Sequence, residues 1–128
     1  MRLLLDTTVL IDYLRGAPAA DRLDEHLRQG DTALATAVNV EELVRGLLPK
    51  EELHARDLVD GLVVLPLGPE EGWRAGAWRR EHAARGVTLS QADCLIAAAA
   101  VAADAVLVTG NPKHFPMREL RVEHWPVG

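Results

Sequence analysis

Apolar positions along the chain follow two different periods. Short extended segments, which favour strands, are expected over residues 2–5, 32–37, 62–67, 105–109 and 121–124. Between them apolar residues recur at helical spacing, so helices are expected over residues 8–15, 18–28, 39–48, 51–60, 69–85 and 90–103. Strands that alternate with helices form parallel sheets with right-handed crossovers. The pattern predicts an α/β fold: a three-layer α/β/α domain, a single unit over residues 1–128, with a mainly parallel sheet of about four or five strands.

Residues with strong turn and cap preferences mark the ends of these helices. Pro18 suits a first helical turn, and Gly86 suits the position just after a helix. Asn39 and Ser90 are expected as N-caps, and Pro49 is expected to end the helix that Asn39 opens.

Polar residues follow two of the predicted strands. Asp6, Thr7 and Thr8 come directly after the first strand, and Thr109 and Asn111 lie at and beyond the end of the strand over residues 105–109. In open parallel sheets, sites lie beyond the carboxyl ends of the strands. The topology therefore predicts a functional site at this edge of the sheet.

Composition narrows the class of protein. Hydrophobic residues make up 48% and charged residues 26% of the 128, which is typical of a folded chain rather than a disordered one. The only cysteine, Cys94, excludes a disulfide within the chain and a four-cysteine zinc site, and favours a cytoplasmic location. Asp6 ends the first apolar run too early for a signal peptide, and no membrane-spanning segment of about 20 apolar residues is expected.

The net charge of −5 argues against nucleic-acid binding through bulk basicity. Of the 14 basic residues, only Lys50 and Lys113 are lysines; arginine is the better planar donor to phosphate, although codon bias in a GC-rich genome would give the same excess. Any RNA substrate would need local arginines or bound cations. Arg15 and Arg45, at helix ends, are candidates for phosphate contact, with solvated helix-end charges as the alternative.

Three acids stand at the predicted site edge: Asp6, Glu42 and Asp93. Glu42 is expected in the first turn of the helix opened by Asn39, and Asp93 in the first turn of the helix opened by Ser90. Clustered carboxylates repel one another unless a cation compensates. An oxygen-only set of this kind suits Mg²⁺ or Mn²⁺, which activates water and stabilises charge on phosphate.

Helix capping is the alternative explanation of the same acids. Residues 39–42 and 90–93 both have the form of a capping box, and Asp6 is suited to cap the helix that follows it. Helical periodicity places Glu41, rather than Glu42, nearer the apolar stripe. The residues alone leave both explanations open.

Four segments in order carry a resemblance to a known family. They are Leu-Leu-Leu-Asp-Thr-Thr-Val-Leu-Ile at 3–11, Glu-Leu-Val-Arg-Gly at 42–46, Asp-Cys-Leu-Ile-Ala-Ala at 93–98, and Leu-Val-Thr-Gly-Asn-Pro-Lys-His-Phe at 107–115. In order and spacing they resemble the PIN-domain ribonucleases, most closely the VapC toxins of bacterial toxin–antitoxin pairs. The resemblance spans nearly the whole chain.

The resemblance implies a Mg²⁺- or Mn²⁺-dependent endoribonuclease with Asp6, Glu42 and Asp93 as catalytic and metal-binding acids. Thr7 matches the hydroxyl residue after the first acid. Asn111 stands where the family has an acid or amide; because it is neutral, we expect one firmly bound metal ion and a second that arrives with the RNA phosphate. Thr109 is expected to hydrogen-bond Asp6 or a metal-bound water, unless it merely ends its strand.

The resemblance also implies partners: an RNA substrate, a VapB-type antitoxin that shields the acids, and a second copy of the chain in a homodimer. Two alternatives remain. One is a PIN nuclease of RNA processing or decay without an antitoxin, and the other is a non-catalytic binding module whose acids are helix caps.

Structural roles are expected for several further residues. The predicted helix over residues 69–85 carries Trp73 and Trp78 among arginines that include Arg79 and Arg80, which favours a core-facing tryptophan pair over an RNA-binding face or a peptide groove. Asp12 is expected at the surface or beside an arginine, and Cys94 in the core. The five histidines show no zinc spacing.

Overall fold

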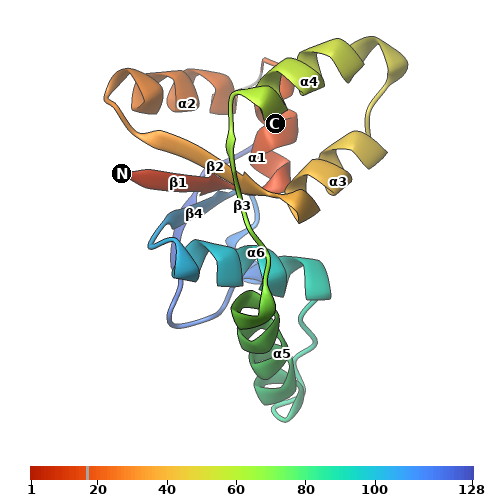
Figure 1. The fold of residues 1–128 in the computed structure, drawn as a ribbon, viewed down its shortest axis with the longest axis vertical. Coiled ribbons are helices and arrows are strands. Elements are labelled where there is room, and N and C mark those ends of the chain that lie inside the picture. Colours follow the sequence, from red (N-terminus) through yellow and green to blue (C-terminus); the bar gives the residue numbers. More distant parts are fainter. Residues whose placement is uncertain (17) are drawn as a thin grey trace.

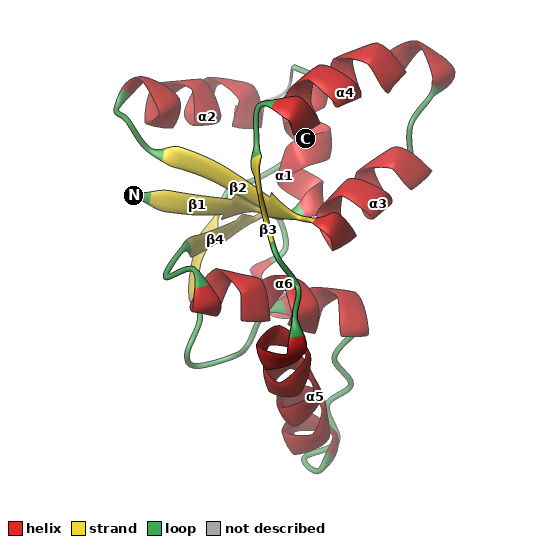
Figure 2. Cartoon of the chain, viewed as in Figure 1, coloured by secondary structure: helices red, strands yellow, loops and turns green. Residues whose placement is uncertain are grey.

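A five-stranded parallel sheet forms the centre of the protein (Figure 2). In the computed structural model, which describes residues 1–16 and 18–128, the strands are β1 (Arg2–Leu5), β2 (Thr32–Thr36), β3 (Val63–Leu65), β4 (Val106–Thr109) and β5 (Arg121–His124). Their order is β3-β2-β1-β4-β5, and each neighbouring pair is parallel. The predicted parallel sheet is confirmed, with β1 at its centre.

Helices cover both faces of this sheet (Figure 1). They are α1 (Thr7–Leu14), α2 (Pro18–Arg28), α3 (Ala37–Arg45), α4 (Glu52–Asp60), α5 (Pro69–Ala83) and α6 (Gln91–Ala102), joined by the short 3₁₀ turns η1 (Pro49–Glu51) and η2 (Pro112–His114). The cluster on one face includes residues of α1 and α2, and the cluster on the other face includes residues of α5 and α6. The predicted three-layer α/β/α architecture is confirmed.

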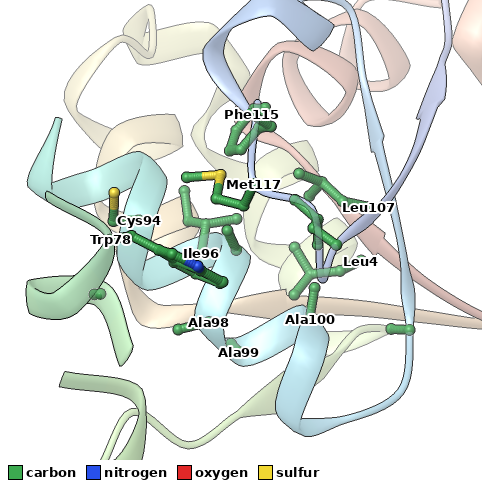
Figure 3. Close-up of a cluster of buried hydrophobic side chains, with 14 of the residues drawn as sticks. Leu4, Trp78, Cys94, Ile96, Ala98, Ala99, Ala100, Leu107, Phe115 and Met117 are labelled. Atoms are coloured by element: carbon green, nitrogen blue, oxygen red, sulfur yellow. The ribbon is translucent and has the colours of Figure 1, made fainter. Parts of the chain in front are cut away.

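Alternation along β1 divides the core into two clusters. Leu3 and Leu5 pack with α1 and α2, whereas Leu4 points to the opposite face and packs with α6. The alanines 97–100 of α6 are all buried, because small side chains let this helix lie close to the sheet. Figure 3 shows Leu4, Leu107 and Ala100 together with Phe115 and Met117 in this second cluster.

The start of α3 corrects the predicted cap. Thr36, not Asn39, is the N-cap: its hydroxyl accepts the Asn39 N–H over 3.3 Å, and Asn39 Oδ1 accepts the Thr36 N–H over 2.9 Å. The prediction of Asn39 as cap was wrong because the hydroxyl at the end of β2 already occupies that position. Glu42 consequently lies in the second turn of α3 and not in the first.

The ends of two other helices differ from the predicted ends by a few residues. The helix expected to run to Pro49 ends at Arg45 with Gly46 as its C-cap, and α5 ends at Ala83. The Ser90 cap is confirmed, since its hydroxyl accepts the Asp93 N–H over 3.0 Å. Over residues 1–16 and 18–128, none of the helices has both the length and the apolar character needed to cross a bilayer.

Candidate active site

Asp6 lies at the carboxyl end of β1, the central strand. It occupies the N-cap position of α1, but its side chain makes no capping hydrogen bond. Its Oδ2 instead accepts hydroxyl hydrogens from Thr109 over 2.6 Å and from Thr8 over 3.2 Å. Asp6 thus holds the N-cap position without a side-chain capping hydrogen bond, and the expected contact between Thr109 and Asp6 is confirmed.

Each of three threonine hydroxyls accepts one hydrogen bond and donates another to a carboxylate. Thr109 accepts the Asn111 N–H, and Thr8 accepts the Gly110 N–H, each over 3.0 Å. Both then donate to Asp6, which is nearly buried. A carboxylate that accepts two such bonds on one oxygen is fixed in orientation.

The third threonine orients Glu42. Thr7 accepts a hydrogen bond from the side-chain amide of Asn39 over 3.2 Å and donates to Glu42 Oε1 over 2.7 Å. The predicted capping box over residues 39–42 is not formed, because Asn39 pairs with Thr36. The structure thus joins Thr7 and Glu42, two predicted site residues, across 35 positions of sequence.

Asp93 lies in the first turn of α6, where its backbone N–H is capped by Ser90. Its Oδ2 lies 3.7 Å from Nδ1 of His114, and the amide nitrogen of Asn111 lies 2.9 Å from Nε2 of the same ring. The sequence interpretation missed His114, because it considered the histidines only as zinc ligands. The signal was its position three residues after Asn111, which a 3₁₀ turn brings to one side.

The pKa values of Asp6 and Asp93 are both raised above the ordinary value of aspartate. Burial raises the pKa of Asp6; the hydrogen bond from Thr109 opposes this, and the charge of Asp93 adds to it. Burial also raises the pKa of Asp93, where Ser90 and His114 oppose the rise and the charge of Glu42 adds to it. Asp93 therefore lies close enough to both Asp6 and Glu42 for their charges to repel.

These acids do not form a closed cage. In the described part of the chain, no three His, Cys, Asp or Glu side chains are gathered tightly enough to hold a metal ion among themselves. The set is nevertheless chemically suited to Mg²⁺ or Mn²⁺, which take oxygen ligands, use few protein carboxylates and keep several waters. A cation there would also relieve the repulsion between the partly desolvated carboxylates.

The two predicted phosphate-binding arginines are paired elsewhere. Arg15 Nε lies 3.1 Å from Glu51 Oε2, and Arg45 Nη2 lies 2.7 Å from Glu41 Oε1. Both pairs are at the surface, where water and salt screen the attraction and the partners are readily exchanged. Contact of either arginine with substrate stays a prediction.

Three ordinary assignments can be compared with the structure. Asp12 is buried and accepts backbone N–H groups from Ala19 over 3.0 Å and Gly128 over 3.2 Å, so its assignment to the surface or to an arginine was wrong. The prediction of a core-facing tryptophan pair is confirmed for Trp78, which is buried, and wrong for Trp73, which is 81% exposed. Cys94 is buried, as expected.

Comparison with known protein families matches residues 3–119 to the PIN domain. The chain belongs to the PIN domain family. This PIN domain is 39% identical over 118 residues to Ribonuclease VapC19 of Mycobacterium tuberculosis, with 89% of this chain and 92% of that protein covered. It is 35% identical over 118 residues to Ribonuclease VapC10 of the same organism, with 91% and 88% covered.

Solved structures share the architecture of this PIN domain. The crystal structure of VapBC2 from Rickettsia felis, bound to a promoter DNA fragment, matches with a TM-score of 0.84 and 25% identity over 98% of this chain and 99% of that chain. DNA-bound VapBC from Salmonella typhimurium matches with a TM-score of 0.83 and 24% identity over 98% of both chains, a likeness of fold. The family resemblance seen in the sequence is confirmed.

Proposed function

We propose that this PIN domain is a metal-dependent endoribonuclease and the toxin of a VapBC-type toxin–antitoxin pair. The observation that carries the proposal is the fixed position of Asp6 at the carboxyl end of β1, where Thr8 and Thr109 both donate to its Oδ2. The charge of Asp93 helps to raise the pKa of Asp6, and the charge of Glu42 helps to raise that of Asp93, with burial as the larger cause of both shifts. The curated relatives named as ribonucleases support the choice of reaction. RNA in the cytoplasm is the substrate we assign.

Asp6, Glu42 and Asp93 are the residues that would hold Mg²⁺ or Mn²⁺. When bound there, the cation supplies positive charge opposite the phosphate and lowers the pKa of a bound water. Two of the three carboxylates are already oriented by threonine hydroxyls, so little reorganisation of those side chains would be needed. Asn111, beside them, adds no negative charge of its own.

Water is the nucleophile that this site favours. The hydroxyls of Thr7, Thr8 and Thr109 already donate to carboxylates, and Cys94 is buried, so none of them is placed to attack phosphorus. In line attack by water forms a new bond to phosphorus and breaks the bond to the 3′ oxygen, which takes up a proton. The expected products carry 3′-hydroxyl and 5′-phosphate ends.

A VapB-type antitoxin is the proposed protein partner. The supporting observation is that the solved relatives over nearly the full chain are VapBC proteins. A homodimer of the toxin belongs to the same proposal. A PIN nuclease of RNA processing would share the catalytic site but would have no antitoxin, so co-expression with the product of an adjacent small reading frame separates the two.

The test is cleavage of a mixed RNA pool in Mg²⁺, in Mn²⁺ and in EDTA. Wild-type protein is compared with Asp6→Asn, Glu42→Gln and Asp93→Asn, and with Glu41→Gln as the matched control. Glu41 is the neighbour of Glu42 but pairs with Arg45 at the surface. We expect cleavage in either metal, loss in EDTA and in the three site variants, and full activity in Glu41→Gln. Equal activity of Glu42→Gln and Glu41→Gln would remove Glu42 from the site.

A further inference from the structure

An acidic nuclease site has to attract a polyanion. The chain carries a net charge of −5, and the carboxylates of the site add to the repulsion of RNA phosphate. Arg15 and Arg45, the cations expected to help, are paired with Glu51 and Glu41. Beside a cation held by the acids, a hydrogen-bond donor of the protein itself would help to hold the phosphate.

His114 is placed to be that donor. It ends the η2 turn beyond the carboxyl end of β4, and its backbone N–H donates to Asn111 O over 3.1 Å. The next residue, Phe115, is buried in the core and anchors the turn. The imidazole itself is 57% exposed, so an incoming ligand can reach it.

The hydrogen bonding of the ring leaves one N–H without a close acceptor. The Asn111 amide nitrogen lies 2.9 Å from Nε2 and 3.4 Å from Nδ1 of the ring. An amide N–H donates, so whichever ring nitrogen receives it, the N–H on the other nitrogen gains no acceptor from Asn111. The carboxylate oxygen beside the ring, Oδ2 of Asp93, lies 3.7 Å from Nδ1, which is too long for a hydrogen bond.

We propose that His114 is a substrate-binding residue whose imidazole N–H donates to a non-bridging phosphate oxygen of the RNA beside Asp93. The proposal rests on the proposed function and adds to it the group that holds the phosphodiester. A phosphate oxygen accepts and cannot donate, which matches an unoccupied N–H. The neighbouring Asn111 amide keeps the ring turned toward the acids.

Binding and cleavage are measured separately to test this. In an Asp6→Asn background, which stops cleavage, the affinity for a short fluorescent single-stranded RNA pool is measured by anisotropy in Mg²⁺. His114→Ala and His114→Gln are compared with His54→Ala, a control on exposed α4. We expect His114→Ala to weaken binding about tenfold, the effect of one hydrogen bond to a charged group. His114→Gln, which keeps a donor, should lose less, and His54→Ala should lose nothing.

Each other outcome is decisive. RNA affinity that is unchanged in His114→Ala overturns the proposal, including when kcat falls, because that result would assign His114 only to the positioning of Asn111 and Asp93. Thermal unfolding of every variant identifies loss of fold, and His114→Gln then decides the question. A parent protein that cleaves no RNA but binds it through His114 would contradict the proposed function alone, and one that binds no RNA would overturn both.

Discussion

Thr109 donates its hydroxyl hydrogen to Asp6 over 2.6 Å, across 103 positions of sequence. The bond joins the ends of two adjacent parallel strands, since Leu5 of β1 pairs with Val108 of β4. Thr109 is fully buried and also accepts the Asn111 N–H. It therefore connects the orientation of Asp6 to the loop that carries Asn111 and His114.

Replacement of Thr109 by valine should lower both stability and activity. Valine keeps the shape but removes the donor to Asp6 and the acceptor of the Asn111 N–H, at a cost of about 1–3 kcal/mol for buried polar groups left unpaired. Urea denaturation gives the free energy of unfolding, and cleavage assays well below the transition give kcat. Thr109→Ser, which retains the hydroxyl, is the control; a serine variant as impaired as the valine variant would contradict this role.

Asp6→Asn should abolish cleavage and yet stabilise the fold at neutral pH. Burial raises the pKa of Asp6 above its ordinary 3.8, so the folded state binds the proton more tightly than the unfolded state. Stability from this group is fully present below the unfolded pKa and is lost as pH rises through the folded pKa. Asparagine can still accept from Thr8 and Thr109 through one oxygen, because both bond Oδ2.

Urea midpoints of wild type and Asp6→Asn, measured in EDTA over a range of pH, check this prediction. EDTA is needed because a cation bound only to the folded wild type would itself add stability. The advantage of the variant should shrink as pH falls toward the ordinary range of aspartate. A variant less stable than wild type at neutral pH would show that the charge of Asp6 is well compensated.

Gly110 and Val127 should behave as a coupled pair. A Cβ added at Gly110 would lie 2.8 Å from Val127 Cγ2 and 2.9 Å from Cγ1. Gly110→Ala should therefore cost about 1–3 kcal/mol of stability by overpacking. Because the Gly110 N–H donates to Thr8, which donates to Asp6, it should also lower kcat.

The double variant Gly110→Ala with Val127→Ala tests the cause of this loss. Removal of the valine methyls should restore most of the stability and kcat, and Val127→Ala alone should have little effect because this side chain is partly exposed. The coupling energy comes from a double-mutant cycle of unfolding free energies. Additive effects would show that the clash is relieved by movement of the chain around Val127.

Asp12→Ala should destabilise the fold without removing a site residue. The carboxylate accepts hydrogen bonds from the N–H of Ala19, in the first turn of α2, and from the N–H of Gly128. Loss of a helix-capping acceptor costs about 0.5–2 kcal/mol. Denaturation of Asp12→Ala and Asp12→Asn measures the loss, which should be smaller for asparagine. Cleavage at low temperature should be retained; a selective loss of kcat with normal stability would instead assign Asp12 to the site.

The fold class could be predicted because its signals are local. Apolar runs such as residues 2–5 and the helical spacing of residues 90–103 depend only on side chains a few positions apart. Local signals also explain why Asn39 was wrongly predicted as the N-cap of α3. Thr36 and Asn39 are both good capping residues, and which of them is the N-cap depends on where β2 ends.

The ordered acids, Asp6, Glu42 and Asp93, could be named as candidates from the sequence, but their positions alone left both capping and ligation open. Only the folded chain separates these explanations for Asp6 and Glu42, by showing what their side chains contact. The spacing of His114 from Asn111 was a signal in the sequence, but only the folded chain shows that its imidazole lies beside Asp93, with Nδ1 3.7 Å from Oδ2.

The succession of strands and helices, and the polar residues that end β1 and β4, are properties of the chain itself, because hydrophobic period and turn preference act over a few residues. The partnership of Thr109 with Asp6, and of Thr7 with Glu42, was decided by tertiary structure. The parallel register of β1 and β4 and the packing of α3 beside α1 bring these residues within hydrogen-bond distance, and no local pattern encodes a contact across 35 or 103 positions.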